Sequence, residues 1–307
     1  MSRRHRRKSW QRLLTHLPKI IAGLVGVSML AGGVYFFTKK TPEDHFKAGI
    51  ALQKSGDLKG AAIELKNLLQ LQPGNGEARL QLGRIHFANG DFQAADKELK
   101  KALELGVNDP ELLPLQARTL LILNQPQRVL DEINEKAQAG PEINAAILAL
   151  RARAQLLLNN QAEAETLLAD ADARFAGGAE SLVSRAILAL TQKKTEEALV
   201  FVDQALLKSA QRADLWVMKG DLLRLLKRNE EALAAYAKAK AIEPGNISAH
   251  LVSAQIHLES GALDKTEADL KALRKYAPNN VMGRYLEAYV DFRHSRFSEA
   301  DAKLQDV

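Results

Sequence analysis

The 307-residue chain contains no cysteine, few aromatic residues and few of the patterns that favour strands. The lack of cysteine excludes disulfides, thiolate zinc sites and cysteine nucleophiles. It leaves the cellular compartment open, because a disulfide-free protein can function on either side of a membrane. Alternating apolar and polar runs are also missing, whereas leucine, alanine, glutamate, lysine and glutamine predominate. We therefore expect an all-α protein.

Motifs for catalysis and cofactor binding are missing as well. The chain has no GxSxG, P-loop, HExxH or GxGxxG pattern. His250 and His257 lie seven residues apart, but no acidic residue accompanies them at ligand spacing, so we interpret them as half-buried packing residues. We predict a protein that is not an enzyme and that holds no cofactor or metal.

The positive net charge is confined to one end of the chain. Residues 1–40 contain nine lysines and arginines and no acid, whereas residues 41–307 contain 34 bases and 37 acids, a net charge of −3. The basic character therefore belongs to the N-terminal segment. We expect no nucleic-acid binding, because the remainder lacks a basic stripe with interleaved aromatic residues.

The one long apolar run extends from Ile20 to Phe37 and carries no charged residue. A helix of this length spans about 27 Å, close to the hydrocarbon thickness of a bilayer. Basic residues are concentrated on its N-terminal side, which the positive-inside rule places in the cytoplasm. These features predict a basic cytoplasmic segment at 1–19 and a transmembrane anchor at 20–38. The rest would lie in the periplasm of a single-pass protein of the bacterial inner membrane.

A cleavable signal peptide is the alternative interpretation of the same run. The run is long for a signal peptide, and no clear small-x-small cleavage site follows it. A lipoprotein box would need cysteine where Gly33 stands. We therefore favour an uncleaved anchor.

Beyond residue 41 the chain repeats with a period of about 34 residues, broken by one extra residue near Gly140. The eighth position of each unit is always glycine or alanine, the twentieth is nearly always alanine, and the twenty-fourth is always apolar. Small residues at two fixed positions allow two antiparallel helices to approach closely, and the apolar residue fills the space beside them. The predicted repeats start at Pro42, Gly76, Pro110, Ala145, Ala179, Ala213, Ile247 and Val281.

A helix–turn–helix unit of about this length resembles the tetratricopeptide repeat (TPR). The resemblance implies a TPR right-handed superhelical solenoid of about eight repeats over residues 42–307, preceded by the one transmembrane helix. The last unit stops at Val307, inside its second helix. We therefore expect a longer chain or an end that is normally covered. Arrays of this type bind partners and rarely catalyse reactions.

The candidate binding residues lie at the positions that line the inner, concave face of such arrays. Position 9 holds Arg84, Arg118 and Arg153 in three successive repeats, and Asp221 further on. Arginine offers a planar fork to carboxylates and phosphates, so a ladder of arginines would bind an anionic partner. An acidic peptide or a uronic-acid-rich polysaccharide would fit. The alternative is that these arginines pair with acids of neighbouring helices.

The same face becomes aromatic near the end of the chain, at Tyr285, Tyr289 and Phe292. Exposed aromatic residues in a groove suggest contact with a protein or a sugar. Packing against a further repeat is the alternative, and the one we favour.

Residues 60–133 are the most distinctive part of the chain, with GAAIELKNLLQLQP followed by EARLQLGRIHFANGDFQAADKELKKALELGV. This stretch resembles the PrsT family of TPR proteins, which accompanies the PEP-CTERM/exosortase system and exopolysaccharide gene clusters. The resemblance implies a scaffold for exopolysaccharide production or export, or for sorting of PEP-CTERM proteins, with no catalytic residues. Family members often begin like lipoproteins, which Gly33 excludes here.

Three other functions remain open. The array could assist the assembly of pili or of an outer-membrane secretion channel. It could be the substrate-docking arm of an enzyme whose catalytic domain lies beyond Val307. A cytoplasmic regulatory array would result if the anchor were inverted.

Overall fold

The structure is a computed structural model that describes residues 40–135 and 140–305. These residues form sixteen α-helices and no strand. The helices are α2 (Pro42–Lys54), α3 (Leu58–Leu71), α4 (Gly76–Ala88), α5 (Phe92–Glu104), α6 (Leu112–Ile122), α7 (Pro126–Glu132), α8 (Gly140–Leu157), α9 (Gln161–Arg174), α10 (Ala179–Thr191), α11 (Thr195–Lys208), α12 (Ala213–Leu225), α13 (Asn229–Ile242), α14 (Ile247–Glu259), α15 (Leu263–Tyr276), α16 (Val281–Arg293) and α17 (Phe297–Gln305).

The chain divides into two compact units between Ile85 and His86, inside α4. In the first unit α2 packs against α3. Its core contains Leu65, Leu68 and Leu82, which are all buried. The Thr41 side chain accepts a hydrogen bond from the Asp44 backbone N–H, and the Asp44 side chain accepts one from the Thr41 backbone N–H. The two bonds form a capping box at the start of α2.

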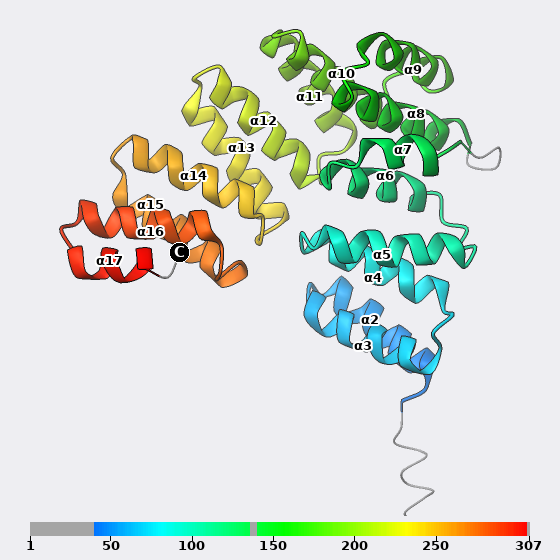
Figure 1. Ribbon diagram of the computed structural model, residues 1–307, viewed down its shortest axis with the longest axis horizontal. Helices are drawn as coiled ribbons and strands as arrows, with labels where there is room; N and C mark the ends of the chain where they lie inside the picture. Colours follow the sequence, from blue (N-terminus) through cyan, green and yellow to red (C-terminus); the bar gives the residue numbers. More distant parts are fainter. Residues whose placement is uncertain (1–39, 136–139, 306–307) are drawn as a thin grey trace, which may run out of the picture. The chain divides into compact units, whose positions relative to one another are not determined.

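In the second unit, helices pair as hairpins that follow one another along the chain, for example α8 with α9 and α12 with α13 (Figure 1). The first helices of successive pairs also touch, as α6 does with α8 and α8 with α10. The second helix of a pair contacts the first helix of the next, as α11 does with α12. Each pair therefore buries its apolar residues against its neighbours as well as within itself.

The turn inside every pair contains one residue with a positive φ, at the fifteenth position of each predicted repeat. Glycine supplies it at Gly56, Gly90 and Gly261, where left-handed backbone carries no steric penalty. The other five turns place a residue with a side chain in the same conformation. They are Asn124, Asn159, Lys193, Lys227 and Ser295, with φ values from 53° to 62°. The turn geometry is therefore kept even where glycine is absent.

The close approach predicted within each pair is clearest between α12 and α13. A Cβ atom added to Gly220 would lie 2.5 Å from Cε1 of Tyr236, which is fully buried. The Tyr236 hydroxyl donates a 2.6 Å hydrogen bond to Oδ1 of Asp221. Burial, followed by this hydrogen bond, raises the pKa of Tyr236. Glycine at the eighth position thus makes room for the largest residue found at the twenty-fourth.

Helix starts differ from the predicted repeat starts around the extra residue. Helix α8 begins at Gly140, before the predicted start at Ala145, and it is 18 residues long. Helix α7 before it has only seven residues. Helix α6 begins at Leu112 rather than Pro110. The irregularity of the period is therefore absorbed by a short second helix and a long first helix.

The predicted fold class requires a correction. Within residues 40–135 and 140–305, no helix combines the length and the apolar character that crossing a bilayer demands. The longest, α8, carries Glu142, Arg151 and Arg153. The prediction of a fold with a transmembrane helix is therefore wrong on this finding, as is the predicted single-pass location in the inner membrane with a periplasmic array. Segments 1–19 and 20–38 lie outside the described residues.

The turn geometry yields a stability prediction for Lys193→Gly. Left-handed backbone costs a residue with a side chain roughly 1–2 kcal/mol. Glycine avoids this cost, but it loses more conformational entropy on folding, which offsets roughly 0.5–1 kcal/mol of the gain. We expect a net stabilisation of about 0.5–1 kcal/mol in urea unfolding.

Gln192→Gly is the matched control, because the neighbouring residue has an ordinary φ of −86°. This change should destabilise the protein. Equal effects of the two substitutions would contradict the role assigned to the left-handed position.

Candidate functional site

A buried carboxylate, Glu180, brings together three arginines from three different parts of the second unit. Glu180 is the second residue of α10, and its side chain is only 6% exposed. Its Oε1 lies 3.1 Å from Nη1 of Arg118 on α6 and 2.5 Å from Nη1 of Arg212, the residue before α12. Its Oε2 lies 2.9 Å from Nη2 of Arg153 on α8. We call these four residues the Glu180 cluster.

The charges of the cluster determine how its members ionise. Burial would raise the pKa of Glu180, but Arg212, Arg153 and Arg118 outweigh it and lower this pKa to about 2. Burial lowers the pKa of Arg153, and the positive charges of Arg212 and Arg118 lower it further. The attraction of Glu180 acts in the opposite direction but does not outweigh them. Burial also acts to lower the pKa of Arg212, but Glu180 and Asp214 outweigh it and raise this pKa. The cluster therefore keeps its carboxylate ionised and treats Arg153 and Arg212 differently.

Two further acids lie at the edge of the cluster. Asp214 binds Arg212 through two hydrogen bonds, of 3.1 and 2.6 Å. Glu111 lies 3.6 Å from Nη2 of Arg118. Both acids are more than half exposed, at 62% and 53%. Water therefore screens their charges much more than it screens that of Glu180.

The arginine ladder predicted from the sequence is rearranged in the structure. Arg118 and Arg153 meet, but the third arginine beside them is Arg212, from outside the ninth-position series. Arg84 belongs to the first unit, on α4. Sequence reasoning missed Glu180 and Arg212. Glu180 stands at the second position of its repeat, seven residues before the ninth and therefore on the same helix face, so an acid there was the available signal.

The predicted aromatic residues form an exposed face on α16. Tyr285, Tyr289 and Phe292 are 49%, 38% and 56% exposed. The rings of Tyr289 and Phe292 have centroids 6.5 Å apart, and Phe292 packs edge-on to Phe297 of α17 at 5.6 Å. Aromatic side chains gathered in this way are a typical contact surface. We call these four residues the α16 aromatic face.

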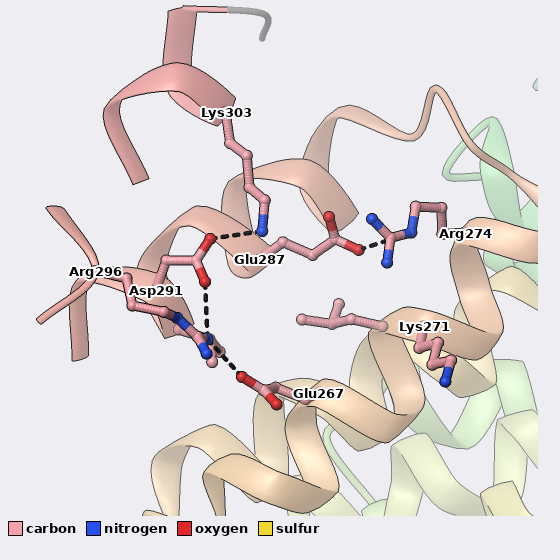
Figure 2. Close-up of a pocket in the computed structure, with 9 residues that line it drawn as sticks. Glu267, Lys271, Arg274, Glu287, Asp291, Arg296 and Lys303 are labelled. Atoms are coloured by element: carbon pink, nitrogen blue, oxygen red, sulfur yellow. Dashed lines mark hydrogen bonds and ion pairs between the residues drawn. The ribbon is translucent and has the colours of Figure 1, made fainter. Parts of the chain in front are cut away.

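A cleft of about 290 Å³ lies between α15, α16 and α17 (Figure 2). Its charged walls are joined to one another, because Arg296 reaches Asp291 at 2.8 Å and Glu267 at 2.6 Å. Lys303 also binds Asp291, at 2.5 Å. These ion pairs tie α17 to the two helices before it, so we interpret the cleft as a structural junction.

The two histidines seven residues apart converge on Asp269. Nδ1 of His257 lies 3.1 Å from Asp269, and Nζ of Lys240 lies 2.7 Å from it. Nδ1 of His250 is 3.5 Å away. Burial would raise the pKa of Asp269, but the nearby His250 and the hydrogen bond from Lys240 outweigh it and lower this pKa. Among the residues that the structure describes, no three potential ligands are grouped as a metal site.

Two family models match parts of the sequence, and both describe the tetratricopeptide repeat. They cover residues 52–119 and 183–247. The chain contains tetratricopeptide repeats. The Glu180 cluster spans four TPR helix pairs, and the α16 aromatic face lies on the last described pair. A search of curated proteins finds no match to the sequence.

Several solved structures are similar to this TPR chain at low sequence identity. Yeast Tom70 is 15% identical, with a TM-score of 0.47, over 88% of this chain and 69% of that one. A TPR protein from Parabacteroides merdae is 17% identical, with a TM-score of 0.47, over 80% and 96%. A chain of the APC/C hetero-tetramer Cut9-Hcn1 is 16% identical, with a TM-score of 0.48, over 78% of this chain and 47% of that one.

The lowered pKa of Glu180 predicts how stability depends on pH. Its folded-state pKa of about 2 lies below the ordinary value of 4.5. The stabilisation is therefore fully present above about pH 4.5 and is lost as the pH falls towards 2. By this shift, Glu180→Gln should cost on the order of 3 kcal/mol at pH 7.

Thermal unfolding of the two proteins between pH 7 and pH 2 provides the measurement. Their melting temperatures should converge as the pH falls. A gap that stays constant down to pH 2 would contradict the assigned charge interactions.

Proposed function

We propose that this chain is a non-catalytic scaffold that binds a protein partner through the α16 aromatic face. The TPR fold is consistent with a role in protein–protein interaction. The observation that carries the choice of surface is that Tyr285, Tyr289 and Phe292 of α16 are exposed among the described residues. A partner at this face takes the place of the further repeat that the sequence favoured. Aromatic side chains supply large contact areas and are enriched among residues that dominate binding energy.

The charge around this face favours an acidic partner. Residues 271–296 contain six lysines and arginines against two acids, a net charge of +4. Glu287 pairs with Arg274 and Asp291 with Arg296, and Arg296 also pairs with Glu267 outside this stretch. A protein segment that combines apolar side chains with acidic ones would match both properties of the surface. Repulsion between like charges disfavours a second copy of this chain as the occupant.

The resemblance to the PrsT family supports a more specific client. We propose that the partner belongs to exopolysaccharide production or export, or to sorting of PEP-CTERM proteins. An anionic polysaccharide is the second candidate ligand, because Tyr285 and Tyr289 present exposed rings to which sugars could bind. No described residue favours the alternatives of pilus or channel assembly, or of a substrate-docking arm.

Peptide display on the purified chain would test the surface. Peptides selected against the wild type should be rich in aspartate, glutamate and apolar residues. The triple variant Tyr285→Ser, Tyr289→Ser, Phe292→Ser should bind them at least about tenfold more weakly, since each central aromatic typically contributes over about 1 kcal/mol. The control is Ile63→Ser, Val200→Ser, Leu207→Ser, which removes scattered exposed apolar residues.

Three outcomes would overturn the proposal. Selection of basic or purely neutral peptides would contradict the charge argument, and equal binding by both triple variants would contradict the surface. Binding of polygalacturonate that depends on the same three residues, without acidic peptides, would assign the face to a sugar. Self-association that disappears in the aromatic variant would assign it to a second copy.

A further inference from the structure

We propose that the Glu180 cluster is a binding site for an oxyanion, a carboxylate or a phosphate. The ligand would share Arg118, Arg153 and Arg212 with Glu180. The site lies on α6, α8, α10 and the start of α12, away from α16 in the chain, so the proposal does not depend on the function assigned to the aromatic face.

The first observation is an imbalance of charge. The well-buried part of the cluster contains three guanidinium groups and a single carboxylate, that of Glu180. Among the described residues, the other acids in contact are Asp214 and Glu111, which are more than half exposed and bind one arginine each. A second anion beside Glu180 would bring the charges of the buried part closer to balance.

The second observation is a surplus of donors. Three guanidinium groups present about fifteen N–H bonds, whereas one carboxylate offers about four acceptor positions. Nε of Arg118 and Nε of Arg153 are buried and have no hydrogen-bond partner in the described part of the chain. The hydrogen bond and ion pair that the Arg153 side chain makes there both go to Glu180. Buried donors without acceptors are costly, so an acceptor that reaches them binds favourably.

The third observation is access. The side chains of Arg118 and Arg212 are each 20% exposed and that of Arg153 is 15% exposed. The three arginine side chains are therefore partly accessible to a ligand, whereas Glu180 is buried at 6%. Oxyanions are the ligands that the planar guanidinium fork binds in bidentate fashion.

Glu180 then has two roles. It holds the three arginines in place when the site is empty, and it competes with the ligand for the same N–H groups. Loss of an arginine and loss of Glu180 should therefore change the affinity in opposite directions. Unspecific damage to the fold would change both in the same direction.

Isothermal titration of the full chain with inorganic phosphate and, separately, with hexaglutamate would test the site. We expect at least one probe to bind, Arg153→Gln to weaken it about tenfold or more, and Glu180→Gln to tighten it about tenfold. Arg185→Gln is the matched control. Arg185 also lies on α10 and pairs with a carboxylate, Asp172, but takes no part in the cluster. The Arg185→Gln variant should bind the probe with the affinity of the wild type.

The two probes distinguish the sources of the anion. Preference for hexaglutamate indicates acidic side chains of a protein, and preference for phosphate indicates a free or attached phosphate. Failure of both probes to bind would overturn the proposal. The proposal would also fail if Arg153→Gln bound the probe with the same affinity as Arg185→Gln, or if Glu180→Gln weakened binding. Should Glu180→Gln not fold, Glu180→Asp takes its place. It keeps the charge, draws it back from the arginines, and should tighten binding by a smaller factor.

Discussion

The close approach of two antiparallel helices within each pair is the constraint on which the rest of this structure depends. It requires a small residue on the first helix wherever a large one projects from the second, as Gly220 faces Tyr236. It also requires a tight turn, which the left-handed residue at the fifteenth position supplies in all eight pairs. Once a pair is closed, its two remaining apolar surfaces can be buried only against neighbouring pairs, and an array results.

The helix pairs that follow from this constraint could be predicted from the sequence. The regular period and the small residues at fixed positions predict helix pairs and their order, because both signals are local. The left-handed conformation of Lys193 and Lys227 was not predictable from residue type, since lysine has no preference for it. Here the packing of the two helices imposes the turn on the residue. The membrane-spanning helix was predicted from an apolar run in a segment that the structure does not describe.

The candidate site was only partly predictable, for a different reason. Arg118 and Arg153 could be identified because they recur at one repeat position. Their common partner Glu180 lies 62 residues from Arg118 and 27 from Arg153. Nothing in a repeat pattern states which side chains from different repeats share one carboxylate. By contrast, Tyr285, Tyr289 and Phe292 of the aromatic face could be identified directly from the sequence, because they lie on successive turns of one helix, α16, whereas Phe297 joins them from α17.

The bond from Arg118 to Glu180 passes over the whole α8–α9 pair. In repeat arrays each unit normally contacts only its immediate neighbours, so that segments can open independently and the ends fray first. A carboxylate held from three sides links non-adjacent pairs and removes that independence. The stretch from α6 to the start of α12 should therefore open as one cooperative block. This block would be stiffer than the helix pairs before and after it. Binding at one side of the block can then change the stability of the other side.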